Sequence, residues 1–502
     1  MERVKTTNAM YDIGKVFEVV LAFNSVNDRT ELLNIILTKM MEITHSDAGT
    51  LYVVDGDKLR FNIVQNKKHG IYESTNINEE SFPPIILDKY NIQNVSAYAA
   101  IKNEVVSVDD VYDDNEKFNL SGPKKYDRLT GYRTRAMLVI PMCTQGGHTN
   151  EVLGVIQMMN PTDPVTGEET IYFDIANPIL QALTKIAANT LSNLTYVNDL
   201  RVLLHSFATV LTQAIDERSP YNNNHTQNVA FYCEWFAMYL SSIFPKGHKF
   251  HFDTFHIERL VLAALLHDIG KIITPLQIMD KSSRLGDRYD IIKFRFELKK
   301  CQIEIDWLHK RIADDAYAAE KERISDALAF VEYVNTTGFL DNEVLANVAT
   351  LQDLRYKDID GNDMPLLDEV DLKSLSIRVG TLTAEEREIM QEHVVITGRL
   401  LDKIPFLKYY DRIPAWARCH HEFLDGTGYP LGLSGDEIPV ESCIITIMDI
   451  FDALIAKDRP YKKAMPVDKA IGILEKMAED GKLHKELVQL FVESQLWEGI
   501  KR

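Results

Sequence analysis

The sequence predicts an α+β N-terminal module, with an antiparallel sheet and helices on one side of it, joined by a long helix to an all-α domain that carries a helical-hairpin insertion. Three patterns predict this fold class. Short strands separated by turns occupy residues 48–158, apolar residues recur at spacings of three and four through residues 171–204, and a further helical pattern fills much of residues 284–380.

Composition limits the class of protein. The chain has 502 residues, too many for one core, so we expect two to four domains. A hydrophobic content of 45% and a charged content of 26% are ordinary for a soluble protein. The net charge of −19 disfavours a general electrostatic grip on DNA or RNA. An anionic substrate would therefore need a local positive field, from metal ions and a few Lys or Arg side chains.

The same survey predicts a cytoplasmic location. No apolar run reaches the 18 residues of a membrane span, and residues 1–7 lack the apolar core of a secretion signal. Five scattered cysteines form no C-x-x-C pair, which favours a reducing compartment and argues against a thiolate metal site.

The N-terminal module begins after a helical lead-in over residues 1–27. A helix starts near Asp28, and a hairpin turn is expected at Asp55-Gly56-Asp57. The predicted strands cover residues 48–54, 59–64, 105–108, 136–140 and 152–158.

Three segments of this module resemble a GAF domain: residues 113–118, 130–141 and 153–160. The resemblance covers roughly residues 28–195, and we place the domain itself at 28–170. It implies a sensor; some relatives of this kind bind cyclic nucleotides, whereas others have no known ligand and only dimerise. The connecting helix, placed at residues 171–204, fits a signalling helix that pairs with its twin in a homodimer.

The second domain, residues 205–502, contains several chemistry-bearing residues. A histidine and a carboxylate, His267 and Asp268, follow an apolar run and precede Gly270 and Lys271. Adjacent helical residues point about 100° apart, so both can meet one ion only at a helix end or a distortion, which Gly270 allows. Further candidates lie far along the chain, at His225, His393, His420, His421 and Asp449.

The apolar surroundings of these residues are the reason to treat them as candidate metal ligands. Taken singly, each histidine is more often a cap or a surface residue. Polar and charged groups on apolar helices are costly unless they are paired or bound to metal. Asp449 is the clearest example, because apolar residues flank it on both sides, and it needs a cation.

Residues 205–500 resemble the HD-GYP branch of the HD phosphohydrolases, on the pattern H…HD-x-G-K…H…HHE-x-x-D-G-x-G-Y-P…D-x-x-D-A-L…R-P-Y-K. The resemblance implies two or three divalent metal ions, iron or manganese, and hydrolysis of cyclic di-GMP. It implies metal ligation by His225, His267, Asp268, His393, His420, His421 and Asp449, with Asp268 as the bridge. Asp216 stands where three-metal members have a Glu, so it is the candidate for a third metal.

The resemblance also implies substrate contacts. Lys271, Arg459 and Lys462 match positions that hold the phosphate, and the loop Gly428-Tyr429-Pro430 matches one tied to substrate and partner recognition. Asp268 and Lys271 are thus the expected catalytic pair. Glu422 and Asp425 either orient ligand imidazoles or cap the turn.

The insertion over residues 284–380 departs from the family. Seven apolar residues recur at alternating spacings of three and four residues, which is the heptad pattern of a coiled coil: Ile291, Phe294, Leu298, Cys301, Ile305, Leu308 and Ile312. A second helix continues with Ile324, Leu328, Val331 and Val334, so we expect a helical hairpin. Self-packing or a dimer contact is favoured over a lid, because no catalytic residue lies in it; partner docking is another role.

The sequence therefore predicts a phosphodiesterase that hydrolyses cyclic di-GMP to pGpG, or on to GMP, under control of the sensor. One rival is hydrolysis of another cyclic dinucleotide such as cyclic GMP-AMP. The other is a metal-binding regulatory scaffold that acts through protein contacts, which the insertion favours and the complete ligand set disfavours.

Overall fold

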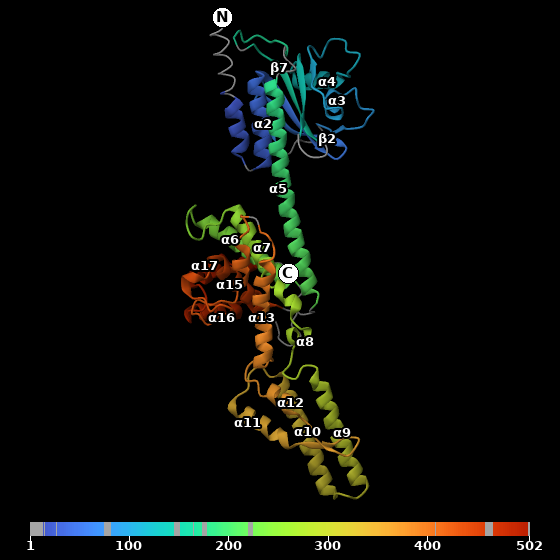
Figure 1. Ribbon diagram of the computed structural model, residues 1–502, viewed down its shortest axis with the longest axis vertical. Helices are drawn as coiled ribbons and strands as arrows, with labels where there is room; N and C mark the ends of the chain where they lie inside the picture. The colour runs from blue at the N-terminus through green and yellow to red at the C-terminus, as the bar shows by residue number, and fades with distance from the viewer. Residues whose placement is uncertain are drawn as a thin grey trace. The chain divides into compact units, whose positions relative to one another are not determined.

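A computed structural model describes residues 14, 16–26, 28–74, 82–144, 151–163, 165–172, 178–218, 224–406, 408–456 and 465–499. The chain divides into two compact units, Met1–Leu203 and Leu204–Arg502, and each is described by itself (Figure 1). None of the described helices has the length and apolarity needed to span a bilayer.

The N-terminal unit is built on an antiparallel sheet with the strand order β3-β2-β1-β7-β6-β5, and β4 pairs with β2 at one side. Its strands are β1 (Ser46–Asp55), β2 (Lys58–Asn66), β3 (Ile71–Ser74), β4 (Ile85–Ile86), β5 (Val106–Val108), β6 (Met137–Cys143) and β7 (Val152–Pro161). The hairpin turn lies where predicted, because Asp55 pairs with Lys58 across it. The sequence patterns did not indicate the short strands β3 and β4.

Helices cover both faces of this sheet, which corrects the one-sided arrangement that we expected. One face packs on α2 (Arg29–Ile43) and the first part of α5 (Pro178–Asp216), through buried residues such as Leu33 and Leu183. The other face packs on α3 (Val95–Lys102), with α4 (Ser121–Thr130) beside it, around a second cluster. The short, small-residue helix α3 (VSAYAAIK) gives too weak a periodicity to be predicted.

The connecting helix is shifted relative to the prediction of residues 171–204. Helix α5 begins at Pro178 and runs to Asp216, without a break at residue 204. Proline suits the first turn of a helix, because the amide that it lacks has no partner there. The apolar spacing therefore located the helix, and proline chemistry set its start.

The C-terminal unit is helical. Its elements are α6 (His225–Ile243), α7 (Thr254–Leu266), η1 (Ile269–Ile273), α8 (Leu276–Met279), α9 (Arg288–Leu308), α10 (Asp314–Thr336), α11 (Asn342–Thr350), η2 (Leu351–Asp353), β8 (Arg355–Lys357), β9 (Asp363–Pro365), α12 (Glu369–Leu375), α13 (Ala384–Leu401), α14 (Ile413–Arg418), η3 (Gly435–Glu437), α15 (Val440–Ile455), α16 (Val467–Glu479), α17 (Lys485–Ser494) and η4 (Leu496–Gly499). The two-stranded sheet β8-β9 is a small departure from the all-α expectation.

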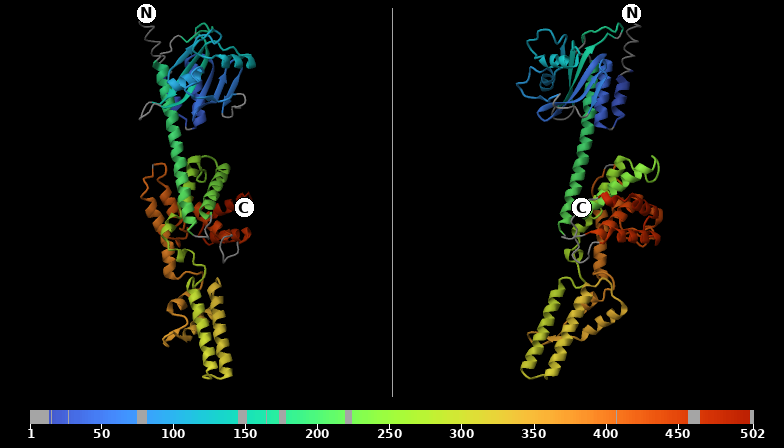
Figure 2. Two further views of the ribbon diagram at one scale, coloured as in Figure 1. Left: turned by 90° about the vertical axis from the view of Figure 1, so that its right-hand side faces the viewer. Right: turned by 180° about the vertical axis from the view of Figure 1, so that it is seen from behind.

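The insertion forms its own core. Helices α9 and α10 lie side by side and antiparallel, as the views in Figure 2 show, so the hairpin is present. Leu285, Phe296, Val331 and Leu375 belong to one buried cluster that is separate from the cluster of helices α6, α7 and α15.

The heptad residues of α9 do not face α10, so the self-packing of the insertion uses a different stripe of the helix. The inward residues are Ile292, Phe296 and Ile303, whereas Ile291, Phe294, Ile305 and Leu308 are exposed. The helix has two apolar stripes, and the more regular one points outward. Ile312 lies beyond the end of α9 and packs on the hairpin core instead.

Candidate metal centre

The HD pair lies where one helix ends and another begins. Helix α7 stops at Leu266, His267 caps it, and the chain continues from Asp268 into the 3₁₀ helix η1. Gly270 serves close packing more than the helix distortion that we expected: a Cβ there would lie 1.9 Å from the carbonyl oxygen of His393. Its missing side chain lets α13 approach the HD turn directly.

A threonine fixes this approach. The hydroxyl of Thr397, one turn after His393 on α13, donates to the carbonyl of His267 at 3.0 Å and accepts from the amide of Gly270 at 3.0 Å. A second threonine does the same for the histidine pair that follows α14. Thr446 on α15 donates to the carbonyl of His420 at 2.7 Å. Each threonine thus ties a helix that carries one candidate ligand to the backbone of another.

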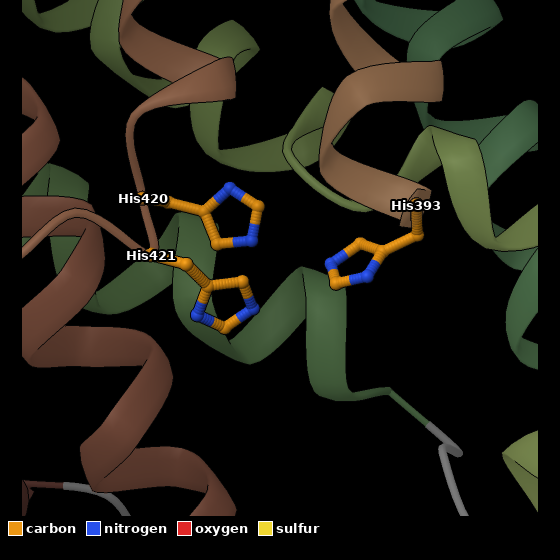
Figure 3. Close-up of side chains that lie close together, drawn as sticks. All are labelled: His393, His420 and His421. Carbon is orange, nitrogen blue, oxygen red and sulfur yellow. The ribbon is translucent and has the colours of Figure 1, made fainter. Parts of the chain in front are cut away.

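Three imidazoles share one orientation. The Nδ1–H groups of His267, His393 and His420 donate to the carbonyls of Ala264, Met390 and Ala417, at 2.5, 2.5 and 2.6 Å. A carbonyl can only accept, so each Nε2 is left with a lone pair that points inward. Figure 3 shows the rings of His393, His420 and His421 converging.

Asp268 lies among these nitrogens. Its Oδ1 is 3.2 Å from Nε2 of His393 and 3.8 Å from Nε2 of His420, while its Oδ2 is 3.2 Å from Nε2 of His267. Lys271 donates to the same Oδ2 at 2.5 Å. The carboxylate therefore contacts several candidate ligands at once, as a bridging ligand would.

The other side of the centre is formed by α6 and α15. Nε2 of His225 lies 3.0 Å from Oδ1 of Asp449. Nδ1 of His225 donates to Asp452 at 2.8 Å, and Asn228 donates to the second oxygen of that carboxylate at 3.1 Å. The sequence reasoning gave Asp452 no role. Its position three residues after Asp449, on the same face of an apolar helix, was the available signal.

Burial and hydrogen bonds shift the pKa values of three residues in the centre. Burial raises the pKa of Asp449, but hydrogen bonding and attraction from His225 overcome this and lower it below its usual value. Burial lowers the pKa of His225, yet the hydrogen bonds to Asp449 and Asp452 raise it to about 10. Burial lowers the pKa of His421 to about 4, so this ring is neutral and able to bind a metal.

Several candidate ligand atoms in the centre lack hydrogen bonds within the described part of the chain, which also fits a site for a metal ion. Nε2 of His267, His393 and His420 and Oδ1 of Asp268 are buried, and none of the described residues forms a hydrogen bond with them. Such atoms are rare and costly in folded proteins unless something binds them. Three groups of side chains among the described residues have ligand atoms within 4.8 Å of one another: His393, His420 and His421; His225, His267 and Asp449; and His267, Asp268 and His420.

Asp216 lies apart from those three groups. The residue is 5% exposed; one carboxylate oxygen accepts from Thr226 at 3.2 Å, and the other has no hydrogen bond to the part of the chain that the structure describes. Burial raises its pKa, against attraction from His225. The residue is buried near the centre, and its part as a ligand stays a prediction.

The loop after the histidine pair packs on the centre. The ring of Tyr429 stacks on His421 at 4.8 Å, and a Cβ on Gly428 would lie 2.4 Å from the amide nitrogen of Phe423. Glu422 accepts from the amides of Leu431 and Leu433, at 2.7 and 3.0 Å. Glu422 thus holds the loop, which decides between the two roles left open for it. Asp425 likewise accepts from Thr427 within the turn.

Arg459 and Lys462, the expected phosphate contacts, lie outside the described residues. Lys271 is placed at the centre, and a further cation reaches its backbone from the end of α5. Arg218 donates to the carbonyl of Lys271 at 3.1 Å and to that of Ile272. The sequence reasoning missed this contact, because nothing in the spacing of Arg218 marks it.

Comparison with known protein families defines the two units. Residues 28–191 match the family model of the GAF domain, and residues 223–338 and 370–487 match two models of the HD domain. The chain therefore carries a GAF domain in its N-terminal unit and an HD domain in its C-terminal unit.

Three curated relatives share part of the sequence. The 3'3'-cGAMP-specific phosphodiesterase 3 of Vibrio cholerae serotype O1 is 49% identical over 96 residues, 19% of this chain and 20% of that protein. The cyclic di-GMP phosphodiesterase of Thermotoga maritima is 40% identical over 119 residues, 23% and 31% of the two chains. The cyclic di-GMP phosphodiesterase response regulator RpfG of Xanthomonas campestris pv. campestris is 34% identical over 226 residues, 43% and 58% of the two chains. The matched region spans less than two thirds of each relative.

Proposed function

We propose that this protein is a metal-dependent phosphodiesterase that hydrolyses cyclic di-GMP to pGpG, or on to GMP, under control of its GAF domain. One observation carries the proposal: the unpartnered Nε2 atoms of His267, His393 and His420 converge on Asp268 in a buried site. Relatives named as cyclic dinucleotide phosphodiesterases support the substrate class.

The proposed ligands are His225, His267, Asp268, His393, His420, His421 and Asp449, for two divalent ions, with Asp216 the candidate for a third. Nitrogen and oxygen donors without sulfur suit iron or manganese. Ions bound there would supply a nucleophile at neutral pH and neutralise charge on the phosphodiester oxygens.

Residues of the chain itself would bind and orient the substrate. Lys271 is buried beside Asp268 and offers a positive charge to a phosphate, in a chain whose net charge is −19. Arg459 and Lys462 are proposed to hold the same phosphate. Tyr429, stacked on His421, places an aromatic ring at the centre beside Gly428 and Pro430, and this loop is the proposed recognition element.

A second candidate substrate is cyclic GMP-AMP. The specific observation in its favour is the 49% identity to a relative named for 3'3'-cGAMP, above the 40% and 34% of the two cyclic di-GMP relatives. Both substrates would use the same ligands, so only a competition between them distinguishes the two.

We propose that regulation passes along α5 in a homodimer, with the domain division at 28–170 and 205–502. Two observations support this route. The C-terminal end of α5 is followed by Arg218, which holds the backbone of Lys271. Exposed apolar residues on α5 recur at 4, 3, 4 and 3, as in a paired helix: Tyr196, Leu200, Leu203, Phe207 and Val210. Five free cysteines support the cytoplasm as its location.

The test is hydrolysis by purified protein loaded anaerobically with Fe(II) or Mn(II). Cyclic di-GMP and cyclic GMP-AMP are supplied separately and then together, and products are separated by chromatography. We expect the His267→Ala and Asp268→Ala variants to lose activity at least about a thousandfold together with bound metal. His205→Ala, on an exposed face of α5, is the matched control and should change neither.

Each outcome has one meaning. Cleavage of cyclic GMP-AMP alone would replace the first substrate with the second. Metal at two or more ions per chain without cleavage of either nucleotide would contradict the enzyme and favour the scaffold. Full activity in the Asp268→Ala variant would overturn the assignment of the centre.

A further inference from the structure

Helix α9 of the insertion presents an apolar face that the described residues of its unit leave largely exposed. Phe294 is 70% exposed, Leu308 65%, Ile291 56% and Ile305 48%. The opposite face, with Ile292, Phe296 and Ile303, is buried in the hairpin core and holds the helix in place. The insertion therefore forms its core without the outward side chains.

The spacing of these residues describes a helix that faces another helix. Ile291, Phe294, Leu298, Cys301, Ile305 and Leu308 recur at 3, 4, 3, 4 and 3, the pattern of heptad positions a and d. Scattered apolar residues on a surface are normal, whereas a continuous stripe of them marks an interaction site. We refer to these six residues as the α9 seam.

The residue types along the α9 seam bear on how two such helices would pair. Positions a are Ile291, Leu298 and Ile305, and positions d include Phe294 and Leu308. Isoleucine at two of the three a positions and leucine at one of the three d positions, beside Phe294 and Cys301, agree in part with the preference of two-stranded parallel coiled coils for β-branched residues at a and leucine at d. Two identical stripes are complementary to each other about a twofold axis, so a second copy of this chain satisfies the pattern.

The flanking charges agree with this orientation. In a parallel pair each g residue lies beside the e residue of the partner helix, five positions on; in an antiparallel pair g lies against g. The first three g positions of α9 are all acidic, and the e positions carry no carboxylate: Asp290, Glu297 and Glu304 at g, and Arg295, Gln302 and His309 at e. Antiparallel pairing would set carboxylates against each other, whereas parallel pairing places Asp290 beside Arg295, a cation that also pairs with Asp371 of its own insertion at 3.4 Å.

The short length of the seam is offset by its rigidity. Roughly two and a half heptads would be marginal for a free peptide, which must first form its helices. Helix α9 is already held by the buried hairpin core and by ion pairs between Arg288 and the carboxylates of Asp368 and Asp371. Association thus costs little conformational entropy. We propose that the α9 seam is a parallel homodimer interface.

Cys301 provides the test. It occupies the central d position, and it is exposed, while Cys143 is half-buried and the three other cysteines are buried. In the proposed register each Cys301 faces its counterpart. Mild oxidation of the full-length protein should give a covalent dimer, and Cys301→Ser should abolish it.

Two engineered cysteine variants test whether the two α9 helices pair in parallel. In the Cys301→Ser background, Leu308→Cys should restore the covalent dimer, since position d meets position d only in a parallel pair. Lys293→Cys, exposed on the same helix but outside the seam, is the matched control and should not. A cross-link at Cys301 without one at Leu308→Cys would overturn the parallel arrangement.

A third variant tests the apolar contact itself. Phe294→Glu combined with Ile305→Glu alters exposed residues, so the fold should persist, and the rate of cross-linking at Cys301 should fall at least tenfold. Lys293→Glu is the control for added negative charge. An unchanged rate, or a chain that sediments as a monomer, would overturn the interface. None of these readouts uses hydrolysis, so they test the interface independently of the proposed function.

Discussion

The candidate ligands of the metal centre come from segments between residues 225 and 449, whereas the core of the insertion comes from one continuous stretch, residues 285–375. In the centre, side chains of α13 and α15 bind the backbone of other segments, as Thr397 and Thr446 do. In the insertion, apolar contacts between neighbouring helices dominate, with Arg284 at the base.

This difference shows that two parts of the C-terminal unit are held together by different kinds of contact. The centre depends on hydrogen bonds of defined direction between distant segments, so small changes there should affect both fold and metal. The insertion depends on its own local packing, so changes there should stay local. The following predictions test that separation.

The largest effect is expected from Gly270→Ala. The new Cβ would lie 1.9 Å from the carbonyl oxygen of His393 and 2.7 Å from the amide of Thr397, so α13 must move. We expect a loss of at least about 3 kcal/mol in the free energy of unfolding, together with loss of bound metal. Gly338→Ala in the insertion meets no atom within 4 Å, and its change should stay below about 1 kcal/mol in either direction. Urea unfolding and metal analysis measure both; equal effects would remove the contrast.

Arg284→Met should destabilise the insertion and leave the centre intact. The buried guanidinium donates to the carbonyls of Ile377 and Val334 at 2.8 and 2.7 Å, and to that of Thr337. Loss of these bonds should cost about 3 kcal/mol, seen as faster amide exchange in α9 and α10. Arg323→Met, which removes an exposed ion pair with Glu320, should cost less than about 1 kcal/mol. A parallel fall in bound metal would show that the two regions are coupled.

Asp452→Ala should weaken metal binding by roughly 10- to 100-fold, because Asp452 orients the ring of His225. Competition with a chelator measures this affinity, and Asp452→Asn should recover part of it by keeping an acceptor for Nδ1–H. Asp468→Ala, on the exposed first turn of α16, is the matched control. If the Ala and Asn variants bind metal alike, the orienting role is wrong.

The smallest effect is expected from Thr397→Val. This nearly isosteric change removes the hydrogen bonds to His267 and Gly270, at a cost of about 1–2 kcal/mol. Thermal unfolding with and without metal should show a larger loss for the metal-loaded protein, because the threonine holds the ligand-bearing turn. Thr336→Val, whose hydroxyl bonds only within its own exposed helix end, should be nearly neutral. An equal loss with and without metal would make Thr397 a purely structural contact.

The candidate ligands of the centre could be named from the sequence, whereas the residues that hold them in place could not. Polar residues such as His267 and Asp449 stand out on apolar helices, because their burial demands a partner. Thr397 and Arg218 act by bonding backbone carbonyls, and no spacing in the sequence marks such a contact. Their positions could be known only after the fold brought distant segments together.

The insertion shows a different limit. Helix α9 carries apolar residues on two faces, and periodicity alone cannot decide which face is inside. The regular stripe with Phe294, for which self-packing and a dimer contact were both open, is exposed, and the neighbouring stripe with Phe296 packs in the hairpin. In the N-terminal unit the main strands of the central sheet were predicted as short apolar segments separated by turns. The helix that covers the second face of the sheet, α3, was not predicted, because it is short and rich in small residues.

The chain leaves the HD domain and returns to it at almost the same place. Arg284 binds the carbonyl of Ile377 at 2.8 Å, Thr381 binds that of Lys281 at 2.9 Å, and Lys281 pairs with Glu386 at 2.8 Å. Closing a loop costs only about 0.6 kcal/mol more for each doubling of its length, so an excursion of roughly ninety residues costs about 2 kcal/mol more than one of ten. A segment with neighbouring ends is therefore a portable part: it can be cut out and bridged by a short linker, or moved to a surface turn of another protein.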